Sequence, residues 1–381
     1  MIKIKSDKII TEKGLFDGFV YIVDNKIYSV SKEDIDSQSF YDYTGKYVSP
    51  GFIDIHTHGA GGYSFSNRNS EDIINACDFH LLHGTTSILP TISSLPIDEI
   101  KSSVMNIAKA IESKKCKSNI IGAHIEGPYF SLRQCGAQYP DFITEPIKED
   151  YESLINEFGK YIKRWSFAPE RDKNGTFCKF LTQNNIIASA GHTDAIYQDM
   201  KIAINNGCNL VTHLYSCTST VTRENGFRRL GVIETAFLED DLFVEIIADG
   251  KHLPPELINM IIKIKGTDKV ALITDSMAIA GTNSVAGVSD GTEYIVEDGV
   301  CKLKDRSAFC GSVATADKLV KVLINECGKD LITAVKMITK VPNEILKLNK
   351  GEIAKGKDAD LVVFDDDINI SSAFVAGVKV I

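Results

Sequence analysis

The sequence has 381 residues, 44% hydrophobic and 24% charged, so it can bury the core of one large domain or of two ordinary ones. Its net charge of −9 argues against a nucleic-acid partner, because binding to a phosphate backbone requires a concentrated positive surface. No apolar run is long enough for a membrane helix, and the first residues alternate like a strand, so we expect a cytoplasmic protein with no membrane partner. The nine cysteines are scattered without a C-x-x-C pair, which argues against a disulfide framework and a thiolate zinc site.

The two ends of the chain carry strand signals. Residues 2–4, 19–23 and 26–30 read as strands, with Asp24-Asn25 as a hairpin turn, and so do residues 359–364 and 373–381. Neither end is long enough to bury a core alone. We therefore expect residues 1–48 and 347–381 to meet as one small β-sandwich beside a central domain.

The central part, residues 49–346, repeats a short apolar segment, a polar turn and a helix-like stretch. Eight strand-like segments cover 52–58, 84–92, 119–127, 162–170, 186–194, 210–216, 243–250 and 270–276. Helical patterns include 71–83, 96–115, 195–206, 254–265 and 314–327. Eight such repeats predict an α/β fold with a closed (β/α)8 TIM-type barrel. A doubly wound open sheet is the alternative, although no G-x-G-x-x-G follows any strand.

A long insertion follows the eighth predicted strand. It covers about residues 280–312 and contains turn signals at Asp290-Gly291 and Asp298-Gly299. Long excursions at a barrel rim are often functional, so the segment is either a lid or wall of the site, or a passive hairpin.

Titratable residues gather where the predicted strands end, which in a barrel is the shared mouth that holds the active site. Only two of the eight histidines, His80 and His83, lie elsewhere, and we expect structural roles for both. The residues at the strand ends that we single out are His56, His58, Glu126, His192, His213, His252 and Asp275.

Six of these residues form a candidate metal site. His56 and His58 are two apart and so share one face of a strand. Any one of the residues alone reads more simply as a core histidine or a capping carboxylate. Together with Glu126, His192, His213 and Asp275 they give a sulfur-free ligand set that suits a divalent transition metal: zinc, iron, manganese or cobalt.

Such a site favours hydrolysis, because a divalent cation lowers the pKa of water from about 15.7 toward about 7. Asp275 is the candidate that accepts the proton of the water and hands it to an amide nitrogen, and His252 is a natural donor to the carbonyl oxygen or a substrate hydroxyl. Arg223, Arg228 and Arg229 lie within seven residues. They form either a solvated helix start or a clamp for a phosphate or carboxylate.

Motifs over most of the chain carry a family resemblance. They are PGFIDIHTHG (50–59), HIEGPYF (124–130), GAQ (136–138), APE (168–170), GHTD (191–194), THLY (212–215), ADGKH (248–252), TDS (274–276) and GKDADLV (356–362). In this order they resemble the N-acetylglucosamine-6-phosphate deacetylases of the amidohydrolase superfamily. The first and last motifs are widespread in the superfamily, whereas EGP and ADGxH are more specific to this branch.

The resemblance implies a barrel with a split β-sandwich, a homodimer, and removal of acetate from the sugar phosphate in amino-sugar recycling. By position, Glu126, His192 and His213 correspond to the metal ligands of the family, Asp275 to its acid/base and His252 to its substrate-contacting histidine. Some members lack the His-x-His pair and hold one ion. Its presence here favours two ions with Glu126 as the bridge, and no lysine is present for a carbamylated bridge.

Four positions depart from the family or vary within it. Ser216 and Cys217 replace an Asn-Ala pair whose main-chain amides bind phosphate. Gln138 stands where some members have a substrate-contacting histidine. The phosphate-binding arginine, which the family supplies across the dimer interface, aligns best with Arg223, with Arg228 or Arg229 as substitutes.

Two alternatives to the glucosamine substrate therefore stay open. One is deacetylation of the galactosamine epimer or of another N-acyl compound. The other, from a different class, is a non-catalytic barrel that acts as a scaffold; such a protein typically loses ligands, and none is missing here.

Overall fold

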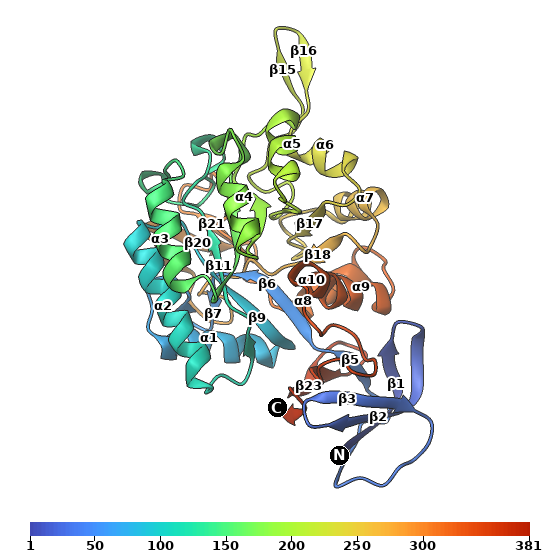
Figure 1. The fold of residues 1–381 in the computed structure, drawn as a ribbon. Coiled ribbons are helices and arrows are strands. Elements are labelled where there is room, and N and C mark those ends of the chain that lie inside the picture. Colours follow the sequence, from blue (N-terminus) through green and yellow to red (C-terminus); the bar gives the residue numbers. More distant parts are fainter.

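The computed structural model describes all residues from Met1 to Ile381, and its centre is a parallel β-barrel (Figure 1). The strands follow one another in chain order around the barrel, each parallel to the next. They are β6 (Phe52–Thr57), β9 (Thr85–Ile92), β11 (Ala123–Glu126), β12 (Ile162–Phe167), β13 (Ile187–Ala190), β14 (Leu210–Val211), β17 (Phe243–Ile246) and β18 (Val270–Leu272). The predicted third strand is split at Gly122, whose φ of 157° separates β10 (Asn119–Ile120) from β11.

The barrel closes just beyond β18. The amide of Asp275 donates to the carbonyl of His56 at 2.9 Å, and the amide of His58 donates to the carbonyl of Ser276 at 2.8 Å. These bonds join the last strand end to the first strand. The predicted barrel is therefore confirmed, and the open doubly wound sheet is wrong.

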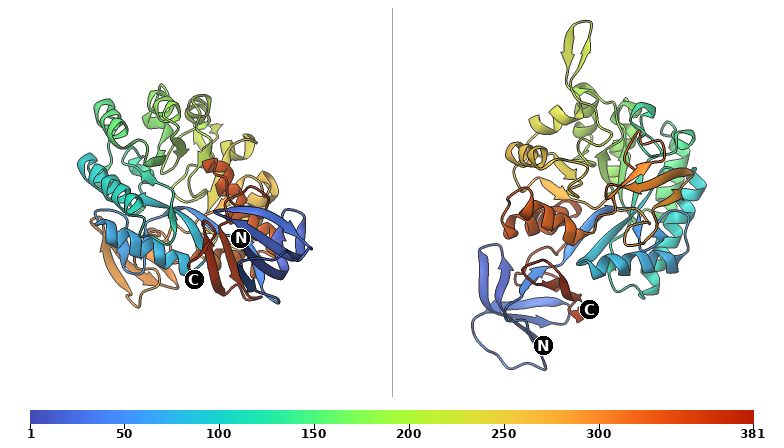
Figure 2. Two further views of the ribbon diagram at one scale, coloured as in Figure 1. Left: turned by 60° about the horizontal axis from the view of Figure 1, so that its bottom comes forward. Right: turned by 180° about the vertical axis from the view of Figure 1, so that it is seen from behind.

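Helices surround the barrel on its outer face (Figure 2). They are α1 (Ser70–Leu82), α2 (Ile97–Ser113), α3 (Lys148–Phe158), α4 (Thr176–Gln183), α5 (Tyr197–Asn205), α6 (Val232–Leu238), α7 (Pro255–Lys265), α8 (Ala316–Asn325), α9 (Leu331–Ile338) and α10 (Lys340–Leu346). None of them combines the length and apolar character that spanning a bilayer requires.

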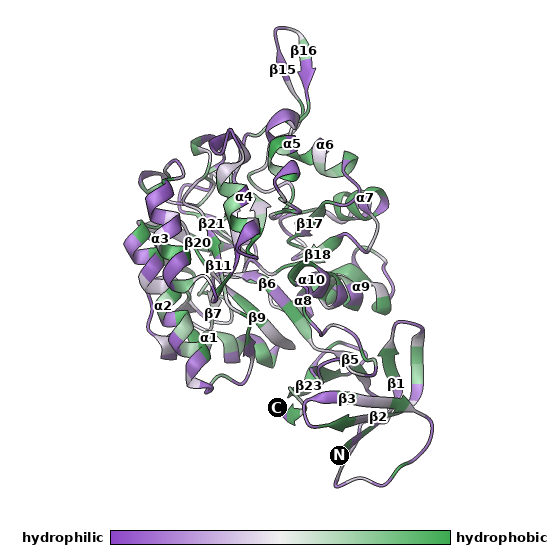
Figure 3. Ribbon diagram, in the orientation of Figure 1, coloured by the Kyte–Doolittle hydropathy of each residue, from purple (hydrophilic) through white to green (hydrophobic).

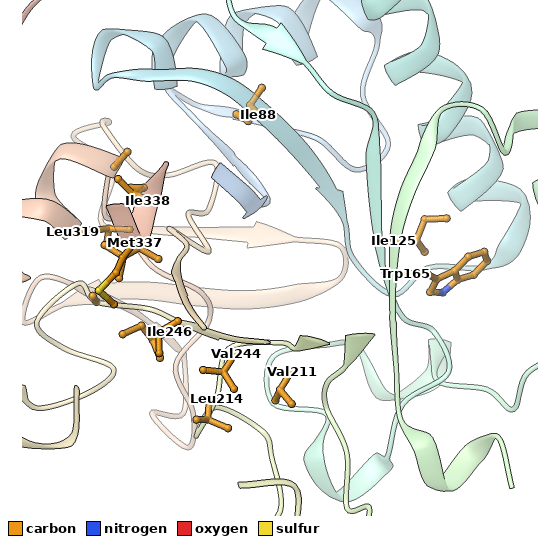
Figure 4. Packing of buried hydrophobic residues seen from close by; sticks show 14 of the residues in the cluster. Ile88, Ile125, Trp165, Val211, Leu214, Val244, Ile246, Leu319, Met337 and Ile338 are labelled. Carbon is orange, nitrogen blue, oxygen red and sulfur yellow. The ribbon is translucent and has the colours of Figure 1, made fainter. Parts of the chain in front are cut away.

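The main hydrophobic core lies between the strands and these helices. Figure 4 shows Ile125 and Trp165 on neighbouring strands, while Leu319, Met337 and Ile338 come from α8 and α9. In Figure 3 the hydrophobic colour follows strands such as β9 and β18, and α3 is largely hydrophilic. Because side chains alternate along a strand, this outer core leaves every second strand residue facing the barrel interior.

Both chain ends contribute to one small β domain, as predicted. Its strands are β1 (Ile2–Thr11), β2 (Gly14–Val23), β3 (Lys26–Ser31), β4 (Ser39–Asp42), β5 (Tyr47–Pro50), β22 (Leu361–Phe364), β23 (Ile370–Val375) and β24 (Val378–Lys379). They form a continuous sheet in which β5 pairs with both β1 and β22. Side chains from both parts, among them Ile4, Val20, Val363 and Phe374, share one buried core. The N- and C-termini lie in this domain (Figures 1 and 2).

The insertion after β18 forms a three-stranded antiparallel sheet: β19 (Ala286–Ser289), β20 (Thr292–Glu297) and β21 (Val300–Leu303). The two predicted turns fall between these strands, where Asp290 and Asp298 have φ of 49° and 56°. The hydroxyl of Thr292 donates to the carbonyl of Ala137 at 3.1 Å, which ties the insertion to the loop after β11. The segment is thus a wall of the barrel mouth.

The segment that carries the three clustered arginines is a β-hairpin, so the predicted helix start is wrong. Strand β15 (Thr222–Glu224) pairs with β16 (Phe227–Arg229) across an Asn225-Gly226 turn, in which both residues have positive φ. Asn-Gly is the most favoured pair for such a turn. The hairpin projects from the barrel at the end of the molecule opposite the terminal β domain (Figures 1 and 2).

Candidate active site

A pocket of about 300 Å³ lies at the carboxyl ends of the barrel strands. Most of the site residues that the sequence analysis singled out line it, and the insertion contributes Asp290 and Phe309. No lysine or arginine is among its lining residues. The predicted residues in the lining are His58, Glu126, Gln138, His192, His213, Ser216, Cys217, His252 and Asp275. His56 lies fully buried in β6, beside these groups.

Four imidazoles converge on the carboxylate of Glu126. Its Oε1 lies 3.0 Å from Nε2 of His213, 3.2 Å from Nε2 of His56 and 3.3 Å from Nε2 of His192. Its Oε2 lies 3.1 Å from Nε2 of His58. Strand ends up to 157 residues apart (213 − 56) thus place their polar atoms in one cluster.

Asp275 faces the same cluster from the eighth strand end. Its Oδ1 lies 3.3 Å from Nε2 of His58 and 3.4 Å from Nε2 of His56. Asp275, His192 and His213 all have positive φ, at 48°, 47° and 26°. Non-glycine residues rarely adopt this conformation, and such strain is typical of functional sites. It turns each residue out of its strand direction at the barrel mouth.

The ring nitrogens that face away from the cluster have partners in the surrounding chain. Such contacts fix the orientation of an imidazole and direct its other nitrogen toward a bound cation. Nδ1 of His192 lies 2.9 Å from the carbonyl oxygen of Gln134, Nδ1 of His213 lies 3.0 Å from that of Ser216, and Nδ1 of His58 lies 3.1 Å from the hydroxyl of Ser93.

These residues fit a divalent metal. Nε2 of His56 is fully buried and makes no hydrogen bond, because its contact with Glu126 lacks suitable geometry. A buried polar atom without a partner is costly, and a cation would satisfy it. Three sets of ligand atoms lie within 4.8 Å of one another: His56, His58 and Glu126; His56, His213 and Asp275; and Glu126, His192 and His213. Imidazole and carboxylate suit zinc and its neighbours among the transition metals.

The charges of the cluster are mutually dependent. Burial raises the pKa of Glu126, but the neighbouring imidazoles outweigh this and hold it well below its usual range. Burial lowers the pKa of His56, while the charges of Glu126 and Asp275 raise it to about 9. Both carboxylates are therefore ionised at neutral pH, the state in which they bind cations.

His252 and Gln138 take up different positions in the pocket. His252 is held from behind, since Nδ1 donates to Oδ2 of Asp249 at 2.8 Å. Gln138 uses both ends of its amide: Oε1 accepts from the amide of Ser94 and Nε2 donates to Oε2 of Glu126, each at 2.8 Å. Gln138 thus lines the pocket and also contacts Glu126 of the cluster.

The main-chain amide of Cys217, in the loop after His213, is free to donate to a ligand. The amide of Ser216 donates to the carbonyl of His213 at 2.9 Å, whereas the amide of Cys217 has no acceptor in the chain. Cys217 has a φ of 51° and its sulfur lies against Gly136, where a Cβ would come within 2.5 Å.

The structure does not bring the three arginines to the pocket of their own chain. Arg223 and Arg228 lie opposite each other in the exposed hairpin, and neither forms an ion pair. Arg229 is paired with Glu224 at 2.9 Å.

Three histidines lie outside the site, and the contacts of His80 and His83 fit the structural roles predicted for them. His80 is fully buried, with Nε2 3.1 Å from the hydroxyl of Thr57 and 3.2 Å from the carbonyl oxygen of Gly59. His83 pairs with Asp317 at 3.2 Å. His124, at the end of β11, is also directed away from the pocket, because its two ring nitrogens contact Thr91 and Ser166.

Several residues near the site were missed by sequence reasoning. Asp249 precedes His252 within a motif that the sequence analysis quoted, so the motif itself was a usable signal. Asp290 reaches the pocket only because the insertion folds over the mouth. Glu170 follows β12, and it accepts hydrogen bonds from the hydroxyl of Thr193 at 2.5 Å and the amide of Asp194 at 2.7 Å. It thereby fixes the loop that carries His192.

The chain is similar in sequence to known proteins. Residues 47–380 match the model of the amidohydrolase family. The chain is 30% identical over 335 residues to the N-acetylglucosamine-6-phosphate deacetylase of Lysinibacillus sphaericus, with 88% of this chain and 85% of that protein covered. It is 29% identical over 357 residues to the N-acetylgalactosamine-6-phosphate deacetylase of Shewanella sp. (strain ANA-3), with 92% and 87% covered.

Solved structures give the same result. The chain superposes with a TM-score of 0.92, at 26% identity, on a mutant N-acetyl-D-glucosamine-6-phosphate deacetylase from Mycobacterium smegmatis in complex with N-acetyl-D-glucosamine-6-phosphate, covering 100% of this chain and 99% of that one. The N-acetylglucosamine-6-phosphate deacetylase from Pasteurella multocida also gives a TM-score of 0.92 at 26% identity, with 99% of each chain covered.

Proposed function

The chain belongs to the amidohydrolase family, and on this premise we propose that it hydrolyses N-acetyl-D-glucosamine 6-phosphate to D-glucosamine 6-phosphate and acetate. The observation that carries the proposal is the convergence of four imidazoles and two carboxylates beside a pocket of about 300 Å³. A non-catalytic scaffold does not need an intact set of metal-ligating side chains. The similarity to named deacetylases over most of the chain supports the substrate class.

The family is metal-dependent, and we infer two divalent transition-metal ions per subunit. His56, His58, Glu126, His192, His213 and Asp275 are the residues that would hold them, with Glu126 shared between the two sites. When bound, such ions make water acidic enough to attack an amide at neutral pH. The presence of both His56 and His58 supports two ions rather than one.

The position of Asp275 supports a role for its carboxylate in proton transfer. Its carboxylate is in the cluster and also lines the pocket, so it can accept a proton from the attacking water and donate it to the leaving nitrogen. His252 is oriented by Asp249, and with protons on both ring nitrogens it can donate from Nε2 to the substrate carbonyl oxygen, where negative charge develops.

The phosphate requires a cation that the pocket of one chain does not supply. We propose that the protein is a homodimer in which Arg223 of the partner subunit, carried by the projecting hairpin, contacts the phosphate. The exposed and unpaired state of Arg223 and Arg228 supports this, because a guanidinium fork without an acidic partner is free to bind an anion. The amide of Cys217 is a second donor for the phosphate oxygens.

The galactosamine epimer is the second candidate substrate. It is supported by the similarity to N-acetylgalactosamine-6-phosphate deacetylases, which cover nearly the whole chain at slightly lower identity. The two sugars differ only in the orientation of the C4 hydroxyl.

The test is an assay on the purified protein with its metals quantified by mass spectrometry. Acetate release is then measured with N-acetylglucosamine 6-phosphate, its galactosamine epimer and an N-acetyl amino acid, each with the metals found. We expect the highest kcat/KM for the glucosamine compound. A higher value for the epimer would reassign the substrate, and no acetate release from any compound by the metal-loaded protein would favour the scaffold.

A further inference from the structure

A charged pair lies inside the barrel, beside the metal cluster. Glu245 is in the middle of β17 between Val244 and Ile246, which face the outer core, so its side chain points inward. Arg164 points inward from β12, and both side chains are fully buried. Buried charges are costly unless they are paired and fully hydrogen-bonded.

Arg164 is fully satisfied. All five of its N–H groups donate: two to the carboxylate of Glu245, and the others to Ser189, Thr212 and the carbonyl of Ile55 at 3.0, 2.9 and 3.2 Å. These acceptors come from four other strands or strand ends of the barrel. Arg164 therefore holds the carboxylate of Glu245 in one position.

Glu245 also contacts two histidines of the cluster. Its Oε2 lies 3.4 Å from Nδ1 of His56 and 3.4 Å from the amide of His213. The outward-facing nitrogens of His58, His192 and His213 meet only neutral oxygens, from a hydroxyl or a carbonyl. Among the four imidazoles, His56 alone has a carboxylate behind it.

We propose that Glu245, held by Arg164, is the positioning residue for His56. The carboxylate keeps the proton on Nδ1, so that Nε2 presents its lone pair to the cluster, and it makes this imidazole the strongest donor of the four. The inference rests on the metal site of the proposed function but not on the substrate. Nε2 of His56 itself has no hydrogen-bond partner in the chain.

The proposal predicts an unequal effect on the two ions. His56 belongs to two of the three ligand sets, whereas Glu126, His192 and His213 form a set without it. Loss of the Glu245 carboxylate should weaken the ion at His56 and His58 about 10- to 100-fold, the usual effect of removing a partner behind a metal-bound histidine. The other ion should lose less affinity, because Glu245 contacts its ligand His213 only at the main-chain amide.

Two variants and one control test this. Glu245→Gln removes the charge, and Glu245→Asp keeps the charge that balances Arg164 but withdraws it from His56 by one methylene. Asp54→Asn is the matched control, because Asp54 is a buried carboxylate two residues before His56 that accepts hydrogen bonds from Thr274 and from the main-chain amide of His56 but contacts no imidazole. Each protein is stripped of metal, checked for folding by circular dichroism, and titrated with Zn²⁺ and Co²⁺, with metal per chain and the Co²⁺ absorption spectrum as readouts.

We expect two ions in the wild type and in Asp54→Asn, and one tight and one weakened ion in both Glu245 variants, with a changed cobalt spectrum. If Glu245→Asp binds each of the two ions as tightly as the wild type does, the proposal is overturned. It is also overturned if the wild type binds only one ion. These readouts need no substrate. A protein that binds metal as expected but releases no acetate would contradict the proposed function and leave this inference standing.

Discussion

Oδ2 of Asp249 accepts a hydrogen bond from Nδ1 of His252 at 2.8 Å. Oδ1 accepts hydrogen bonds from the main-chain amides of Lys251 and His252 at 2.9 and 2.8 Å. Burial raises the pKa of Asp249, but its hydrogen bonds to His252 outweigh this and lower it. The carboxylate is thus an ionised, fixed acceptor that sets the direction of the His252 ring.

Asp249→Asn should therefore lower kcat/KM about 100-fold with little change in metal content. An amide in this place no longer supplies the negative charge that stabilises His252 with protons on both ring nitrogens, so fewer molecules present a correctly oriented Nε2–H donor. Steady-state kinetics and metal analysis check this. Asp330→Asn is the control. It removes a hydrogen-bonded carboxylate that caps α9, away from the pocket. If Asp249→Asn keeps the wild-type kcat/KM, the orientation of His252 by Asp249 does not contribute to the reaction.

Asp275→Asn should keep most of the bound metal and lose turnover by a factor of about 10³. The amide still offers an oxygen to the cluster, but it cannot accept and return a proton, and positioned general acid–base catalysis contributes roughly 10²- to 10⁴-fold. Single-turnover kinetics with metal-loaded protein measure the effect. Turnover within a few-fold of wild type would exclude Asp275 as the proton carrier.

Arg223→Ala should raise KM for the phosphorylated sugar about 10-fold or more, and far more than KM for unphosphorylated N-acetylglucosamine. A lost hydrogen bond to a charged group costs about 1.5–3 kcal/mol, which corresponds to this range. Arg229→Ala is the control, because Arg229 is paired with Glu224. Light scattering on both variants checks that the oligomeric state is retained. An equal effect on both substrates would show that Arg223 does not contact the phosphate.

His80 should make folding stability depend on pH. Burial lowers its pKa in the folded protein to about 4, against about 6.5 in an unfolded chain. Between these values the unfolded chain binds a proton that the folded one does not, so stability falls as the pH drops from 6.5 to 4, by about 3 kcal/mol in all. Urea unfolding at pH 7 and pH 4.5 should give a smaller difference for His80→Gln than for wild type. The same difference in both proteins would contradict the assignment.

The barrel and the metal cluster could be predicted from sequence for one physical reason. Parallel strands in a closed barrel bring their carboxyl ends together, so residues such as His56 and Asp275 can be assigned to one mouth from strand ends alone. The alternation of strand and helix patterns is local and survives in the sequence.

The supporting residues could not be found in this way. Glu245 and Arg164 look like ordinary charged residues in short strands, and only the three-dimensional facing of β17 and β12 identifies them as a buried pair. Asp290 depends on how the insertion folds over the mouth. The hairpin at 222–229 was missed although Asn225-Gly226 is a clear local turn signal, because the arginines on either side were interpreted only as a helix start or as an anion clamp.

The pairing of β5 with β22 has a consequence for synthesis on the ribosome. Residues 1–50 are translated before the barrel, yet three of the eight strands of their sheet, and part of their core, come from residues after 360. The amino-terminal strands must therefore wait, incompletely paired, while the whole barrel is made. Unpaired strands are prone to associate with other chains, so nascent polypeptides stalled or truncated before residue 361 should be targets for chaperones and proteases.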